Sequence, residues 1–399
     1  MINKSLLVAV TLCLVARAIA EPPKECFVGY PRQYVARHLT PAESATMELD
    51  GRMLESVWST VPWSAAFTDI QGDAIAPAPY LNTQTKMLWD DHCLYIAAMM
   101  EEPQAWAVSS INNSLLYQEN DFEVLVDPDG CDWRYSELEI NALGTQWNLL
   151  LARPYVDGGP CVCRNITPGQ CASSAPDQGV YDTWDVERYL KYGINIDGAL
   201  NNPQQGSKSW AVELCIPVEQ YLKYSTRRKI TEGDYWRLNM LRVQWHLKVE
   251  KLPSGALVYV KDPDKKCNNW AWQPTGVVNI HIPNRWGIVQ FGSTINSQQA
   301  AVMDDLWPIR NALIKVYEAE HIYTALYGKG YTDSLPALVE NAHLDADLAS
   351  GKSLCVGGQP VIHLSSSDAF VVDIKSLDNP NVIGHITHER FISFTTTTQ

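Results

Sequence analysis

The chain has 399 residues and a formal net charge of −14, with 31 Lys and Arg against 45 Asp and Glu. Because no basic run interrupts this acidic balance, nucleic acids and anionic membranes are not expected partners. The 18 Tyr and 14 Trp far outnumber the 7 Phe. Rings with a polar group suit both a protein core and a surface that stacks on sugars, so this composition favours neither use by itself.

The N-terminus carries the pattern of a secretory signal peptide. Lys4 precedes the apolar run "LLVAVTLCLVA", and small residues end this segment at Ala20. The run is shorter than the ~20 apolar residues that a membrane span needs, so we predict a cleaved signal peptide over residues 1–20 and an extracellular protein without a membrane span. Asn112 in "NNS" and Asn165 in "NIT" are then expected glycosylation acceptors on a eukaryotic secretory route.

Nine cysteines would remain after removal of this peptide. In an oxidising compartment most of them should form disulfides, and one is left over. Cys161, Cys163 and Cys171 lie together in the Gly/Pro-rich segment "GGPCVCRNITPGQC". Since Cys-x-Cys is not the spacing of a zinc knuckle, a disulfide that braces an irregular loop is favoured there over a metal site.

Residues 46–292 consist of short apolar or alternating segments separated by Asn, Asp, Gly and Pro. Examples are "TKMLWDD", "DFEVLVDP", "SELEINALGT" and "WRLNMLRVQWHL". Many short strands with almost no helical periodicity predict a mainly β fold, an antiparallel, jelly-roll-like β-sandwich. Five tryptophans of this region are expected to fill its core or cover its edges: Trp58, Trp89, Trp210, Trp236 and Trp286.

Two of these strands place polar side chains on one face, because successive side chains of a strand point to opposite sides. Glu137, Glu139 and Asn141 share a face of "SELEINA", and Glu123 alternates with apolar neighbours in "DFEVLVD". If the strands pair, these groups form a polar platform. Paired acids also suggest glycoside hydrolysis, but that chemistry needs both carboxyls across one scissile bond, and the sequence gives no sign of such an arrangement. We therefore expect a protein that is not an enzyme.

Residues 298–395 predict a small α+β domain of unknown role. Apolar residues at roughly helical spacing follow a polar linker, and Pro308 fits the first turn, so one long helix should start near Leu306 or Trp307 and end at Gly328 to Gly330. Short strands should follow at Gln359–Leu364, Ala369–Ile374 and Ile383–Ile386.

Six segments in order resemble the family 9-like carbohydrate-binding modules, which are related to DOMON-type sandwiches. They run from Leu49 to Gly292: "LDGRMLESVW", "TKMLWDDHCLYIAA", "NDFEVLVDPDG", "YSELEINALGT", "NNWAWQPTG" and "HIPNRWG". The resemblance implies a β-sandwich that binds a glycan or polysaccharide between two aromatic rings, together with structural calcium. Members of the family accompany glycoside hydrolases, so a separate hydrolase is an expected partner in carbohydrate catabolism.

The resemblance also implies a set of binding residues. Tyr117 falls near the first stacking aromatic, and Glu123 falls on a sugar-contacting carboxylate. The second aromatic position falls near Ile280, beside His281, with Trp272 as a substitute. Carboxylates, amides and Arg satisfy the hydroxyl rim of a pyranose. The polar candidates for that rim are Glu123, Glu139, Asn141, Asn239, Arg242 and Asn279.

Three alternatives stay open at this stage. Asp127 and Asp129 in "DPDGCD" offer oxygens to calcium, although Asp-Pro-Asp-Gly is also an ordinary turn signal and the turn is favoured. Related sandwiches in extracellular cytochromes hold haem between Met and His, and here Met99 or Met100 with His281 would be the pair. A structural or interaction sandwich without a ligand is the third.

Overall fold

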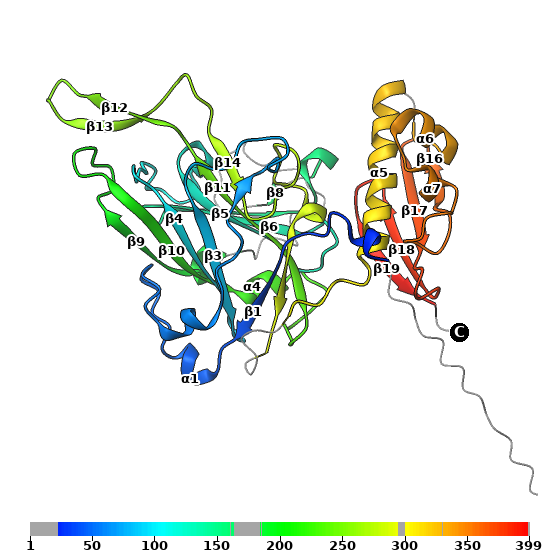
Figure 1. Ribbon diagram of the computed structural model, residues 1–399, viewed down its shortest axis with the longest axis horizontal. Coiled ribbons are helices and arrows are strands. Elements are labelled where there is room, and N and C mark those ends of the chain that lie inside the picture. The colour runs from blue at the N-terminus through cyan, green and yellow to red at the C-terminus, as the bar shows by residue number, and fades with distance from the viewer. Residues whose placement is uncertain are drawn as a thin grey trace, which may run out of the picture.

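The computed structural model describes residues 23–159, 161–162, 184, 186–293, 300–328 and 330–397. The predicted signal peptide, residues 1–20, lies outside this range, as do Cys163, Asn165 and Cys171; of Cys161, only the backbone is described. A large β body and a smaller, helix-led C-terminal body lie side by side (Figure 1). The predicted fold class, a mainly β sandwich followed by a small α+β region with one long helix, is confirmed.

The β body is built on one thirteen-stranded sheet that curls into two layers. Its strands are β1 (Gln33–His38), β2 (Thr68–Asp69), β3 (Thr83–Trp89), β4 (Cys93–Glu101), β5 (Asp121–Asp127), β6 (Tyr135–Asn141), β7 (Gln146–Leu151), β8 (Cys161–Val162), β9 (Lys191–Gly198), β10 (Ser207–Pro217), β11 (Tyr235–Gln244), β14 (Asn268–Ala271) and β15 (Gly287–Phe291). The order is β8-β7-β6-β5-β11-β15-β1-β3-β4-β10-β9, and β14 pairs with β11 and β2.

Strand β1 is the point at which the sheet turns from one layer into the other. Its first four residues, Gln33 to Ala36, pair in parallel with β15, and its last two residues pair in parallel with β3. The remaining pairs among the described strands are antiparallel. The predicted antiparallel sandwich thus contains two parallel pairs at this corner, where one strand serves both layers.

Short helices and one hairpin complete the β body. The strands β12 (Leu247–Lys251) and β13 (Leu257–Lys261) form a separate hairpin that projects away from the sandwich (Figure 1). The helical segments are η1 (Lys24–Phe27), α1 (Pro41–Ser44), η2 (Ser56–Thr60), η3 (Leu116–Gln118), η4 (Tyr155–Asp157), α3 (Val186–Tyr189), α4 (Val218–Leu222) and η5 (Pro283–Arg285).

The main core lies between the two layers. Phe122 and Val124 of β5 and Leu138 and Ile140 of β6 point into it, as their alternation predicts. The five tryptophans expected in the interior are all buried, each no more than 4 % exposed. The opposite side chains of β5 and β6 therefore face away from this core, which leaves the acidic positions on the outer face of their layer.

The "LDGRMLESVW" segment closes against the buried carboxylate of Glu213 on β10. Glu213 accepts hydrogen bonds from the backbone N–H of Gly51 (2.7 Å) and from the indole N–H of Trp58 (2.7 Å). Gly51 has a φ of 79°, and a Cβ there would lie 2.3 Å from the backbone nitrogen of Asn195 on β9. The Asp-Gly and the Trp of this motif thus have a structural explanation, because one buried acid needs both donors and the loop approaches β9 too closely for a side chain.

The Gly of the Trp-Gly pair in "HIPNRWG" is explained by the packing of Trp272. A Cβ on Gly287 would lie 2.3 Å from the Trp272 ring, which is 1 % exposed. We expect Gly287→Ala to lower the free energy of unfolding by about 1–3 kcal/mol, the usual cost of overpacking a core. Urea unfolding measures this effect. If the clash is the cause, Trp272→Phe combined with Gly287→Ala should cost less than the sum of the two single changes, whereas strict additivity would contradict it.

The C-terminal body packs helix α5 (Trp307–Tyr327) on a four-stranded antiparallel sheet. Pro308 lies in the first turn of α5, and Gly328 ends the helix in the left-handed conformation, as predicted. The expected strands are present, whereas two helices and the last strand were not anticipated. The elements are α6 (Leu335–Ala342), α7 (Ala346–Ala349), β16 (Val361–Ser366), β17 (Ala369–Lys375), β18 (Val382–Thr387) and β19 (Ile392–Thr396).

Two disulfides are formed among the described cysteines. Cys26–Cys355 joins η1 to the C-terminal body, and Cys93–Cys215 joins β4 to β10. Within the described part of the chain, Cys131 and Cys267 are free thiols. None of the described helices is both long enough and apolar enough to cross a membrane.

Candidate functional site: an acidic groove on the outer sheet face

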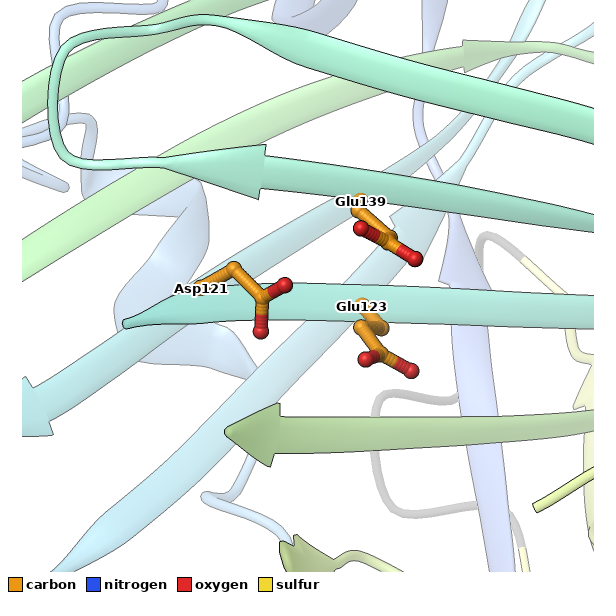
Figure 2. Close-up of side chains that lie close together, drawn as sticks. All are labelled: Asp121, Glu123 and Glu139. Atoms are coloured by element: carbon orange, nitrogen blue, oxygen red, sulfur yellow. The ribbon is translucent and has the colours of Figure 1, made fainter. Parts of the chain in front are cut away.

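The pairing of β5 with β6 creates an acidic platform on the outer face of the sandwich. Glu123 lies directly opposite Glu139, and Asp121 lies opposite Asn141. Figure 2 shows the carboxylates of Asp121 and Glu123 on β5 beside that of Glu139 on the neighbouring strand. Since the alternate residues of both strands fill the core, these acids point away from it.

A groove of about 630 Å³ runs over this platform. Its floor is formed by β5, β6, β7, β11 and β14, and its edges are formed by η3, η4 and the segment before η5. The residues that line it are Leu115, Tyr117, Glu123, Glu137, Glu139, Trp147, Leu149, Tyr155, Val243, Trp245, Cys267, Asn269, Ile280 and His281. Rings and carboxylates therefore share one hollow.

The acids of the floor are buried and close together. Oxygen atoms of Asp121, Glu123 and Glu139 lie within 4.8 Å of one another. Burial raises the pKa of all three well above the usual range, and the charges of neighbouring carboxylates raise them further. Burial also raises the pKa of Glu137 to about 8. This floor thus concentrates acidic groups in a place that disfavours their charged form.

Two tyrosine rings border the groove at different points along β6. The backbone N–H of Tyr117 donates to Glu139 at 3.0 Å, and its ring is 46 % exposed. Tyr155, on η4, is 43 % exposed, and its ring centroid lies 4.6 Å from that of His281. The His281 Nε2 lies 3.7 Å from an oxygen of Glu137. Tyr117 is thus attached to Glu139 through its backbone, and Tyr155 lies beside the histidine that faces Glu137.

His281 is a partly buried side chain at the groove wall, and its surroundings favour the neutral form. Its Nδ1 lies 3.1 Å from the Tyr135 hydroxyl, and burial lowers its pKa to about 4. Asn279 accepts a hydrogen bond from the backbone N–H of His281 at 2.9 Å. The structure thus brings His281 to the groove, while Asn279 fixes the backbone beside it and does not line the hollow.

Besides Asn279, three further expected rim residues and the substitute aromatic do not line the groove. The amide of Asn141 is used inside the β6–β7 turn, where it accepts from Leu143 and Thr145 and donates to Glu119. Arg242 lies on the other face of β11 and forms a buried ion pair, and Trp272 is a core residue beneath Gly287. The amide NH2 of Asn239 donates to the backbone carbonyl of Gln273, and its amide oxygen accepts from the backbone N–H of the same residue.

The expected calcium ligands Asp127 and Asp129 belong to a hydrogen-bonded turn. Asp127 accepts from the backbone N–H groups of Gly130 and Asp132, both at 2.8 Å. Asp129 accepts from the hydroxyl of Ser225 and from Thr226. These protein donors occupy the carboxylates that calcium would need, so the turn accounts for the motif.

The haem ligands proposed from sequence do not meet. Met100 is buried in the core between the layers, whereas His281 lines the outer groove. Met99 is next to Met100 on β4 and therefore points to the outer face of the other layer. Asn112, one of the two expected glycosylation acceptors, is exposed, but its amide donates to Glu187 at 2.6 Å.

The sequence reasoning missed Trp147, Tyr155 and Trp245 as groove residues. Trp147 lies opposite Glu139 in the β6–β7 register, and Trp245 continues the alternation of Leu241 and Val243 beyond the end of β11. Because every second residue of a strand faces the same side, the alternation along β7 and β11 could have identified Trp147 and Trp245 as groove residues. Tyr155 belongs to the short helix η4, outside the strands, and carries no such signal.

The fold and the groove define the class of the protein as a β-sandwich with an acidic, aromatic-lined outer face. Residues 49–148 match the model of the family described as "Carbohydrate family 9 binding domain-like", and this segment holds Tyr117, Glu123 and Glu139. The resemblance recognised in the sequence is thus confirmed for this part of the chain. Comparison with curated proteins finds no match.

Three solved structures are similar over about two thirds of the chain. A putative carbohydrate-binding protein from Bacteroides uniformis shares 15 % identity with a TM-score of 0.42, covering 65 % of this chain and 99 % of that one. A family 9 carbohydrate-binding module from Caldicellulosiruptor kristjanssonii in complex with cellotriose shares 13 % identity, with a TM-score of 0.37 and coverage of 68 % and 100 %. A family 9 carbohydrate-binding module from the same organism in complex with glucose shares 14 % identity with a TM-score of 0.36, covering 68 % of this chain and 100 % of that one.

Proposed function

We propose that the protein is a secreted, non-enzymatic carbohydrate-binding protein that holds a glycan in the acidic groove. The observation that carries this proposal is the presence of two exposed tyrosine rings, Tyr117 and Tyr155, above a floor of carboxylates. A pyranose has an apolar C–H face that packs on aromatic rings and a rim of hydroxyl groups that donate to carboxylates.

The attachment of both tyrosines to the acids of one strand supports a sugar held near both rings. Tyr117 is tied to Glu139, and Tyr155 reaches Glu137 through His281. These acids are two residues apart on β6, which corresponds to about 7 Å along a strand. A glycan that lies along this stretch of β6 would therefore meet both tyrosines and both acids.

The placement of the acids supports binding over hydrolysis. Glu123 and Glu139 lie side by side on adjacent strands of the floor. Glycoside hydrolysis requires two carboxyl groups that flank a scissile bond from different sides. We infer that any role in polysaccharide breakdown is exerted through a separate glycoside hydrolase. Two disulfides support the proposed extracellular location, since such bonds persist in oxidising compartments.

A glycan array probed with the calcium-replete protein tests this proposal. We expect binding to a defined glycan, and a loss of about tenfold or more in affinity for Tyr117→Ala and for Tyr155→Ala, since a tenfold change corresponds to about 1.4 kcal/mol of ring contact. Tyr189→Ala is the matched control, because Tyr189 is also 46 % exposed and does not line the groove. An array without any bound glycan, or unchanged affinity in both groove variants, would contradict the proposal.

A further inference from the structure

Glu123 and Glu139, which line the groove, and Asp121 next to them have the geometry of a cation site. Asp121, Glu123 and Glu139 come from two adjacent strands, and one oxygen of each lies within 4.8 Å of the others. Calcium–oxygen distances are about 2.3–2.6 Å, so two ligands of one ion can be up to about 5 Å apart. A single ion therefore fits between the three carboxylates (Figure 2).

Unpartnered oxygens provide a second and independent observation. Both carboxylate oxygens of Asp121 and the Oε2 of Glu123 are buried without a hydrogen-bond partner. Asp121 is fully buried and Glu123 is 3 % exposed. The backbone N–H of Val243 faces Asp121 but does not reach hydrogen-bonding geometry. Buried polar atoms are normally paired, so these oxygens point to a partner that the protein itself does not supply.

Other buried acids of this chain have hydrogen-bond donors or a counter-ion from the protein. Glu213 accepts from Gly51 and Trp58, and Glu102 pairs with Arg242. The floor acids differ, because among the described residues none of the three takes part in an ion pair within 4.0 Å. Lys261 lies on the groove side of the hairpin, but its ammonium bonds the Gln118 carbonyl and covers the Trp245 ring at 4.0 Å.

We propose that Asp121, Glu123 and Glu139 bind one divalent cation of the oxygen-preferring class, calcium in the first place. The ligand atoms are all carboxylate oxygens, which favour calcium over zinc. The Cys267 thiol lines the same groove, but it does not belong to the cluster of described ligand atoms within 4.8 Å. This site is separate from the Asp127–Asp129 turn, where protein donors already occupy the carboxylates.

A cation at this site would keep free coordination positions on its groove side. Calcium takes 6–8 oxygen ligands, and three carboxylates supply at most six. The remaining positions open toward the groove, because Glu123 and Glu139 line it. Water fills them in the free protein, and hydroxyl groups of a glycan can replace that water; this last step rests on the proposed function.

Calcium titration of the full, EDTA-treated chain in the absence of any sugar tests the cation site. We expect one bound Ca²⁺ per chain by calorimetry, Tb³⁺ luminescence sensitised by the nearby Trp147 and Trp245, and a rise in Tm of about 3 °C at a hundredfold excess of Ca²⁺ over Kd. The double variant Asp121→Asn with Glu139→Gln should bind Ca²⁺ at least tenfold more weakly and lose the Tm shift. Because the amides keep the shape and remove like charges, this variant should fold without Ca²⁺ at least as well as the wild type.

Asp129→Asn is the matched control and should keep both Ca²⁺ binding and the Tm shift. Absence of Ca²⁺ binding in the wild type, unchanged binding in the double variant, or loss of binding in Asp129→Asn would each overturn the site. Zn²⁺ binding that is tighter than Ca²⁺ binding and is lost in Cys267→Ser would overturn the oxygen-only ligand set. Since these measurements need no sugar, they are independent of the outcome of the glycan array.

Discussion

Arg242→Met is expected to lower the free energy of unfolding by about 3–5 kcal/mol, the usual cost of removing one partner of a buried ion pair. The guanidinium lies 3.1 Å from a carboxylate oxygen of Glu102, and both side chains are 1 % exposed. It also donates to Thr83 at 2.9 Å and to the Glu101 carbonyl at 2.8 Å. Methionine fills a similar volume but leaves the Glu102 charge in the interior without a counter-ion. Urea unfolding at neutral pH measures the loss.

Two further variants separate this explanation from a general effect of substitution. Glu102→Gln added to Arg242→Met should recover part of the loss, since it removes the orphaned charge. Arg227→Met removes a half-exposed pair with Asp234, at 3.0 Å, and should cost less than about 1 kcal/mol. If Arg242→Met kept full stability and lost glycan binding instead, Arg242 would belong to the sugar rim, as the sequence suggested.

The β-sandwich was predictable because alternation reports burial directly. In "DFEVLVD" and "SELEINA", apolar and acidic residues alternate, and the structure places Phe122 and Leu138 in the core and Glu123 and Glu139 outside it. The alternation did not show that these two strands are neighbours in the sheet. Once β5 and β6 pair, the register brings the acids together.

The same alternation also exposes an error in the predicted rim. Asn239 and Arg242 are three residues apart on β11, so their side chains point to opposite faces and cannot both face the groove. Counting every second residue along "WRLNMLRVQWHL" puts Asn239 and Arg242 on opposite faces. The same count puts Trp245 on the face of Val243, and both of these residues line the hollow. This part of the site could have been predicted from the sequence.

Other features depend on contacts that one strand does not encode. Trp272 is buried because Gly287 offers it a flat surface, and these residues meet only after β11, β14 and β15 pair. Asn141 has the parity of the groove acids, yet its amide oxygen is bonded by the β6–β7 turn and its amide NH2 donates to Glu119. The unpartnered state of the Asp121 oxygens is likewise visible only when their surroundings are known.

The C-terminal body has a structural link to the groove through Asp157. Arg390 donates to the Asp157 carboxylate at 2.8 Å, and its guanidinium lies 4.4 Å from the Tyr317 ring centroid. The Tyr317 hydroxyl also donates to Asp157. Asp157 is the last residue of η4, which begins with Tyr155 at the edge of the groove. The docking of the C-terminal body therefore holds the short helix that carries this ring.

Arg390→Met is expected to loosen this contact by about 3 kcal/mol, since the Arg390 and Asp157 side chains are 8 % and 3 % exposed and the remaining carboxylate loses its counter-ion. Hydrogen exchange should show faster exchange in 155–157 and in α5, while β4 and β10 stay protected. Under the proposed function, glycan affinity should also fall, because Tyr155 is no longer held in place.

Arg285→Met is the matched control for the Arg390 variant. Arg285 joins the same two bodies through Glu318 at 2.6 Å, but both side chains are about one-third exposed, at 34 % and 37 %, so the loss should stay below about 1 kcal/mol. Asp157→Asn added to Arg390→Met should restore part of the protection, because no buried charge is then left. Equal effects of the Arg390 and Arg285 variants would mean that the Cys26–Cys355 disulfide and the apolar contacts alone position the C-terminal body, and that η4 does not depend on its docking.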